Sequence, residues 1–70
     1  MANVEAEMVA NVWKVLVTPG TAVSEGDTLV ILESMKMEIP VVSPAGGTVT
    51  AVNVTEGGVV QEGDVIAVVE

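Results

Sequence analysis

The feature that most limits what this chain can fold into is an internal repeat. Shifted by 37 residues against itself, the sequence aligns residues 10–33 with residues 47–70 without a gap, and ten of these twenty-four positions are identical. The identical pairs run from Val12 with Val49 to Glu33 with Glu70. A period close to half the chain predicts two similar layers related by a pseudo-two-fold axis rather than an open-ended solenoid.

Both copies have the residue pattern of β-strands. Valine dominates the apolar runs, and turn residues interrupt these runs at short intervals. The expected strands lie at 3–8, 12–17, 22–23 and 28–33 in the first copy, and at 37–42, 48–54, 59–60 and 65–69 in the second. Packing the two units face to face would close a flattened β-barrel or sandwich.

The turns also repeat. Glycine supplies the positive φ that other residues resist, and an aspartate side chain accepts backbone N–H bonds, so these residue types are expected to be structural here. The turn residues assigned in this way are Gly20, Gly26, Asp27, Gly57, Gly63 and Asp64. A calcium loop is the alternative for the Glu-Gly-Asp turns, but their acidic residues are too few and too close together for a full oxygen shell.

Alternation along the strands predicts which side chains face inward. Val15 and Val17 share one face of their strand, as do Val52 and Val54, and this face is expected to be buried. Val12 and Val49 are out of phase with them, and the sequence alone does not determine whether a β-bulge corrects this. The runs 29–32 and 66–69 are apolar on both faces, which predicts strands covered on both sides or close to a strand crossing. Pro40 predicts an edge strand or a bend.

Composition excludes several classes of protein. The 70 residues are expected to form one domain, residues 1–70, with little room for a substrate pocket. Cysteine and histidine are absent, which removes thiolate and imidazole metal sites and the usual general base. The net charge of −8 repels nucleic acid and anionic lipid. No signal peptide or membrane span is evident, so a soluble, cytoplasmic protein is expected.

One stretch breaks the pattern, namely Glu33-Ser34-Met35-Lys36-Met37-Glu38. It links the two copies and is the one expected turn without Gly, Asn, Asp or Pro, although a two-residue hairpin normally selects those residues. Alternation would send the Lys36 side chain to one side of the hairpin and the side chains of Met35 and Met37 to the other. The two-fold symmetry would place this hairpin at the end of the molecule opposite the chain termini. With no nucleophile or base partner nearby, Lys36 is interpreted as a residue to be modified; a solvated turn lysine is the alternative.

This stretch resembles the attachment motif of the biotinyl/lipoyl carrier family, whose biotinyl branch carries Met-Lys-Met at the tip. The resemblance extends over essentially the whole chain through the Gly-containing turns, Trp13-Lys14-Val15 and the duplication. It implies a flattened barrel of two four-stranded antiparallel sheets, a barrel-sandwich hybrid. Ser34 departs from the usual alanine, and residues 7–10 lack the proline and glycine that Pro44 and Gly47 supply in the second copy.

The resemblance implies a non-catalytic biotin carboxyl carrier. Lys36 would be biotinylated by a biotin protein ligase, and the arm would then serve the biotin carboxylase and carboxyltransferase subunits of a carboxylase. The flanking Met35 and Met37 would offer adaptable contacts to these partners, and Glu33, Ser34 and Glu38 would contribute to recognition. The free carrier is expected to be a monomer.

Three alternatives stay open. A lipoyl carrier has the same fold and the same lysine, with lipoate in place of biotin for acyl and electron transfer, and dual modification is also possible; the two methionines favour biotin. An unmodified scaffold module leaves the Met-Lys-Met tip unexplained. A small enzyme lacks a nucleophile–base pair and a cleft. Lys14 is given no function, and Trp13 is interpreted as a packing or partly exposed surface residue.

Overall fold

The computed structural model describes residues 2–70, and within this range the regular secondary structure consists of strands. In chain order they are β1 Ala2–Glu5, β2 Ala10–Val15, β3 Ala22–Val23, β4 Thr28–Ser34, β5 Met37–Val42, β6 Gly47–Val52, β7 Val59–Val60 and β8 Val65–Val69. No helix in residues 2–70 is long and apolar enough to cross a membrane. Compared with the predicted ranges 3–8, 12–17 and 48–54, strands β1, β2 and β6 begin and end one to three residues earlier.

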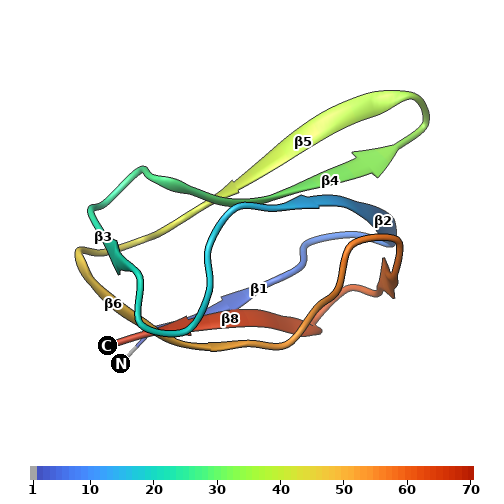
Figure 1. Ribbon diagram of the computed structural model, residues 1–70. Helices are drawn as coiled ribbons and strands as arrows, with labels where there is room; N and C mark the ends of the chain where they lie inside the picture. The colour runs from blue at the N-terminus through green and yellow to red at the C-terminus, as the bar shows by residue number, and fades with distance from the viewer. Residues whose placement is uncertain (1) are drawn as a thin grey trace.

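The eight strands form two antiparallel four-stranded sheets that face each other (Figure 1). The strand order is β1-β8-β6-β3 in one sheet and β5-β4-β2-β7 in the other. Replacing each strand by its repeat partner, β1 by β5, β2 by β6, β3 by β7 and β4 by β8, converts the first order into the second. The predicted all-β fold class, with two four-stranded sheets and pseudo-two-fold symmetry, is therefore confirmed.

The expectation that each sequence repeat forms its own layer is wrong. Each sheet contains two strands from each half of the chain, because the connections between consecutive described strands cross from one sheet to the other, with the single exception of β4–β5. Each half pairs two of its own strands, β2 with β4 and β6 with β8, but its other two strands pair only with strands of the other half. The two repeats therefore depend on each other for folding.

Four β-bulges occur at positions related by the repeat. The register skips Trp13 in β2 and Thr50 in β6, and it skips Leu29 in β4 and Ile66 in β8. A bulge inserts one extra residue and thereby changes which face the following side chains occupy. The bulges at Trp13 and Thr50 explain why Val12 and Val49 are buried despite being out of phase with the rest of their strands.

The same device accounts for the runs that are apolar on both faces. Leu29 and Val30 are both fully buried, as are Ile66 and Ala67, because a bulge places two consecutive residues on the inner side. Ile31 and Val68, in contrast, are only half-buried. These strands are thus covered on one side and bulged, which corrects the prediction that they would be covered on both sides or lie at a crossing.

The core lies between the two sheets. In the described part of the chain it consists of 14 buried apolar residues, one of which is Val17, and Val15, Val52 and Val54 pack against it as partly buried side chains. The inward face predicted for these valines is therefore observed. Pro40 lies in β5, which is an edge strand as expected, and pairs with Ile31 of β4 on one side.

The two Glu-Gly-Asp turns have matching geometry. Gly26 and Gly63 have φ of 89° and 90°. A carboxylate oxygen of Asp27 accepts the Ser24 N–H at 2.9 Å, and Asp64 accepts the Gln61 N–H at the same distance. The aspartates thus stabilise their own turns. Within residues 2–70 no cluster of three or more His, Cys, Asp or Glu side chains is placed to hold a metal ion.

Candidate functional site

The link between the two repeats is a two-residue hairpin. Ser34 pairs with Met37 at the end of the β4–β5 ladder, which leaves Met35 and Lys36 as the turn. Their φ angles are 53° and 65°, and no other non-glycine residue between 2 and 70 has a positive φ. Positive φ at both central positions is the requirement of a type I′ turn, which Asn and Gly meet easily. For Met and Lys it costs on the order of 1 kcal/mol each, so the conflict seen in the sequence is present in the backbone.

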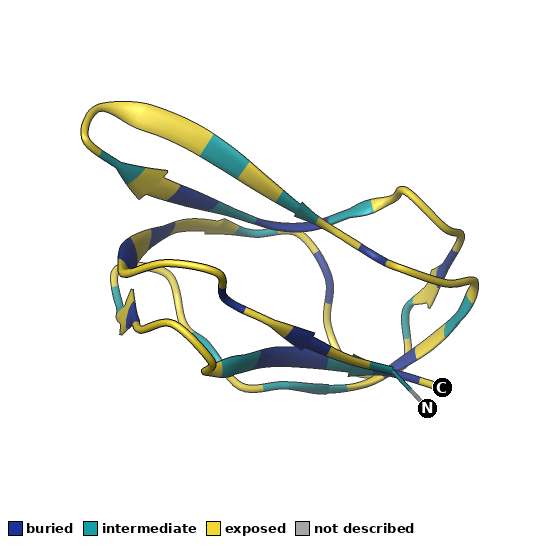
Figure 2. Ribbon diagram, turned by 180° about the vertical axis from the view of Figure 1, so that it is seen from behind, coloured by how far each residue is buried: buried dark blue, intermediate teal, exposed yellow. Residues whose placement is uncertain are grey.

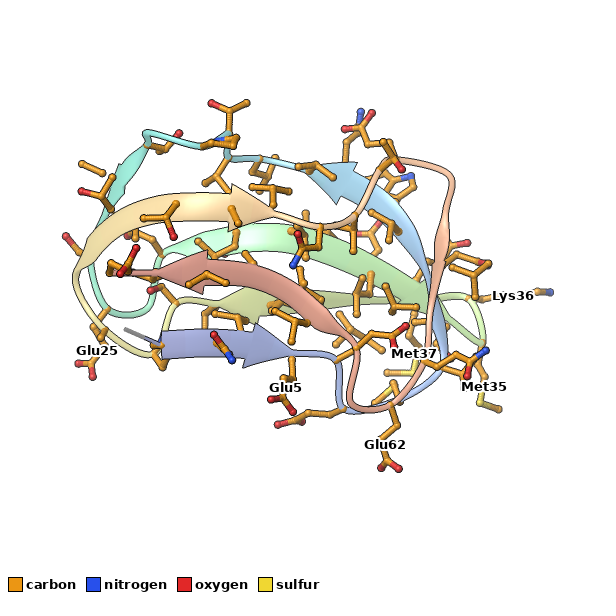
Figure 3. The ribbon with its side chains drawn as sticks, turned by 90° about the horizontal axis from the view of Figure 1, so that it is seen from below. Glu5, Glu25, Met35, Lys36, Met37 and Glu62 are labelled. Atoms are coloured by element: carbon orange, nitrogen blue, oxygen red, sulfur yellow. The ribbon has the colours of Figure 1, made fainter. Side chains whose placement is uncertain are left out.

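The side chains of this hairpin are among the most exposed of the molecule. Met35 is 91% exposed and Met37 is 65% exposed. Figure 2 shows the tip as an exposed stretch that stands away from the body. Lys36 extends past the end of the molecule, whereas Met35 and Met37 point to the side (Figure 3). The lysine amine is thus held out with two flexible, polarizable side chains beside it.

Two carboxylates lie at the base of the hairpin. Glu33 of β4 and Glu38 of β5 are directly paired across the ladder and both are exposed. Like charges in directly opposite positions destabilise a sheet, so this pair does not contribute to folding. Asn11 of β2 is the partner of Glu33 on its other side, and Ser34 is half-buried. The structure therefore places the predicted recognition residues, from Glu33 to Glu38, around the lysine.

The hairpin and the chain ends lie at opposite ends of the molecule, as predicted (Figure 1). β4–β5 is the single connection between described strands that stays within one sheet, so it can extend beyond the body, whereas the crossing loops are held against it. Whatever is attached to Lys36 would be remote from the two chain ends.

Two open grooves in the described part of the chain, residues 2–70, lie away from Lys36. One open groove of about 380 Å³ lies between β1 and β5, and another of about 390 Å³ lies beside β7. Residues of the tip, from Glu33 to Glu38, do not line either groove. The chain also contains no histidine or cysteine that would serve as a base or thiol nucleophile near the lysine. The site offers an accessible amine without catalytic machinery around it.

Trp13 and Lys14 lie on the outer surface of the sheet that carries Lys36. Trp13 is the bulged residue of β2 and is 43% exposed, in agreement with the expectation of a partly exposed side chain. The Lys14 amine lies 5.7 Å from the centre of the Trp13 ring, within the range of a cation–π contact. Sequence reasoning missed this pair as a surface feature, although Thr50, the repeat counterpart of Trp13, was a signal that the fold does not require an aromatic residue there.

Known proteins resemble the chain along nearly its whole length. The biotin/lipoyl family, described as biotin-requiring enzyme, matches residues 2–69. The chain belongs to this family. It is 52% identical over 67 residues to the biotinylated protein TB7.3 homolog of Mycobacterium leprae, covering 96% of this chain and 94% of that protein. It is 48% identical over 64 residues to the biotin/lipoyl attachment protein of Bacillus subtilis, covering 91% and 88% respectively.

Among solved structures, the urea carboxylase of Kluyveromyces lactis matches with a TM-score of 0.92 and 30% identity, covering 99% of this chain and 6% of that one. Membership of the family confirms the resemblance noted in the sequence. It makes this chain a biotin/lipoyl carrier domain, which is not itself catalytic. The family attaches biotin or lipoate covalently, and the biotin-named relatives favour biotin.

Proposed function

We propose that this protein is a biotin carboxyl carrier and that Lys36 is its attachment residue. The observation that carries the proposal is the position of Lys36 in the two-residue hairpin. Among the strand connections described for residues 2–70, this is the one that stays within a sheet, and it extends past the end of the body. An enzyme can enclose this tip without displacing any core residue, since the neighbouring Met35 and Met37 are both exposed.

The residues present fit covalent attachment of biotin. Besides Lys36, the side chains of the tip offer the carboxylates of Glu33 and Glu38, the thioethers of Met35 and Met37 and the hydroxyl of Ser34. An amine nucleophile needs an adjacent base or another source of activation, which a partner enzyme would provide. A biotin protein ligase would therefore supply both the acyl-adenylate and the base. The Lys36 amine attacks the acyl carbon, the amide bond forms, the bond to AMP breaks, and the proton of the amine leaves with the base. The hairpin holds the amine outward during this step.

When bound, biotin supplies a ureido nitrogen that carries a carboxyl group between two active sites. The chain contributes reach and local concentration rather than catalysis. Its hairpin extends from a stiff two-sheet body, and Glu33 and Glu38 place negative charge where a cationic partner surface would approach. Biotin carboxylase and carboxyltransferase subunits are the proposed partners. The similarity to a urea carboxylase supports this carboxylase context. The free carrier is proposed to be a cytoplasmic monomer.

The test is co-expression with a biotin protein ligase, followed by streptavidin blotting and intact mass measurement. We expect one biotin per chain in the wild type and in Lys14→Arg, which keeps the second lysine position cationic, and none in Lys36→Arg. Labelling of Lys36→Arg would contradict the assignment. Incubation with a lipoate ligase tests the lipoyl alternative, because a lipoyl adduct has a different mass; lipoate alone on Lys36 would replace biotin in the proposal.

A further inference from the structure

The outer face of the sheet that carries Lys36 has larger apolar side chains at four positions where the other sheet has three polar side chains and one alanine. Trp13, Leu16, Val42 and Val59 are exposed by 43, 52, 45 and 63% respectively. Their counterparts after a shift of 37 residues are Thr50, Asn53, Glu5 and Ala22, which are also exposed. Since the same backbone geometry tolerates polar side chains in the other sheet, the fold does not require the apolar ones.

The strand register joins most of these side chains into one surface. Lys14, Ile31 and Pro40 form a row across β2, β4 and β5. One row further from the tip, Leu16 continues the β2–β4 ladder by donating its N–H to Leu29 O at 2.9 Å, and Val42 pairs with Thr28. We call the surface formed by Trp13, Leu16, Ile31, Pro40 and Val42 the Trp13 face. Lys14 and Thr28 lie in the same rows, so the surface is largely apolar with one cationic and one hydroxyl side chain. Large exposed apolar surfaces rimmed by polar residues mark interaction sites.

The Trp13 face is continuous with the modification hairpin. Toward the tip, the adjacent row consists of Asn11, Glu33 and Glu38, and two residues further along β4 and β5 the turn begins. A partner lying on the face would meet an apolar centre and then a pair of carboxylates. A second copy of the chain is a poor occupant, because each copy carries a net charge of −8. The chemistry fits a protein with an apolar surface bordered by cationic groups.

We propose that the Trp13 face is the docking surface for the biotin protein ligase; this rests on the proposed function. A ligase meets the chain before any biotin is attached, so it must recognise the protein surface alone. It must also select Lys36 over Lys14, although both are exposed. A ligase seated on the Trp13 face covers Lys14, which lies against the Trp13 ring, and leaves Lys36 at the edge of the contact.

The repeat supplies substitutions that the fold already accommodates. Combining Trp13→Thr, Leu16→Asn and Val42→Glu gives the Trp13 face the residues of the opposite sheet. The matched control makes the reverse changes there: Thr50→Trp, Asn53→Leu and Glu5→Val. Leu16→Asn alone, beyond the end of β2, serves if the triple variant unfolds. Melting temperature and the amide NMR spectrum verify the fold of each variant.

Steady-state biotinylation by a purified bacterial biotin protein ligase is the assay, with carrier concentration varied at saturating biotin and MgATP. The triple variant is expected to raise the KM for the carrier by roughly tenfold or more and to leave kcat within about twofold, because the lost contacts are remote from the amine. The control variant is expected to keep both constants near wild type. A folded triple variant with unchanged KM overturns the proposal.

An independent readout uses the single tryptophan. In ¹⁵N-labelled Lys36→Arg carrier, added ligase is expected to broaden or shift the Trp13 indole N–H and the amides of the Trp13 face, while those of β1, β6 and β8 stay unchanged. Changes confined to residues 33–38 overturn the docking proposal. If sedimentation shows that the wild type is a dimer and the triple variant is a monomer, the Trp13 face binds a second copy of the chain, and this result also overturns the docking proposal. Failure of the ligase to label the wild type contradicts the proposed function instead.

Discussion

The two ends of this molecule are built on the same plan but differ in one respect. At one end β4 and β5 are paired and joined by the Met35-Lys36 turn; at the other, their repeat partners β8 and β1 are paired and bring the terminal strands together. Both pairs carry a bulge at the equivalent residue, Leu29 or Ile66. The body is symmetric and the proposed chemistry lies where the symmetry is broken.

Comparing the halves also separates residues that serve the fold from residues that serve a partner. Gly26 and Gly63 are identical and have the same φ, as expected when the backbone demands them. Trp13 and Thr50 occupy equivalent bulges yet share no chemistry. Glu56 is a further asymmetry: its carboxylate accepts the Val15 N–H at 3.0 Å, whereas its counterpart is Pro19. In a chain with an internal duplication, each position can thus be compared with its equivalent in the other half.

The largest expected effect concerns the two bulged core residues. Leu29→Ala and Ile66→Ala should each lower the free energy of unfolding by about 2–4 kcal/mol, because both side chains are fully buried. Urea unfolding followed by Trp13 fluorescence measures this, and Leu29→Val and Ile66→Val provide milder versions if the alanine variants unfold. Values that differ strongly between the two positions would break the symmetry argument for the core.

An intermediate effect is expected at the paired turns. An added Cβ would meet no atom within 4 Å at Gly26 or at Gly63, so an alanine there suffers from backbone strain alone. Gly26→Ala and Gly63→Ala should each lower the unfolding free energy by about 1–2 kcal/mol. The measurement is the same urea titration, with Gly46→Ala as a control at a glycine that is not among those with positive φ. A neutral result at either turn would show that the turn relaxes.

The smallest effect sharpens the contrast between the two ends. Replacing Met35 by Asn and Lys36 by Gly gives the turn the residues that its positive φ angles favour, and should raise the unfolding free energy by about 1 kcal/mol. The same protein should lose all biotinylation. Thermal unfolding tests the expected gain in stability, and streptavidin blotting tests the expected loss of biotinylation. A less stable variant would mean that Met35 and Lys36 make contacts that offset their strain.

Much of the candidate site was predictable. Lys36 was singled out because its turn lacks the usual turn residues, and a two-residue link in a β-hairpin must expose its middle. The Trp13 face was not predictable from one strand, since its residues come from β2, from β5 and from β4 between them, and only the strand order brings these strands into one sheet. The out-of-phase Val12 raised the question of a bulge, but residue types alone did not decide it, because a bulge is defined by strand pairing.

The sequence by itself determined the symmetry, the strand content, the glycine turns and the exposed lysine, because each of these follows from local residue preferences repeated at a fixed spacing. Only the tertiary structure decided that the two halves interleave and that four bulges set the inward faces. Strand pairing depends on which strands satisfy each other's backbone hydrogen bonds, and paired strands such as β1 and β8 are far apart in the sequence. Local pattern cannot choose among them.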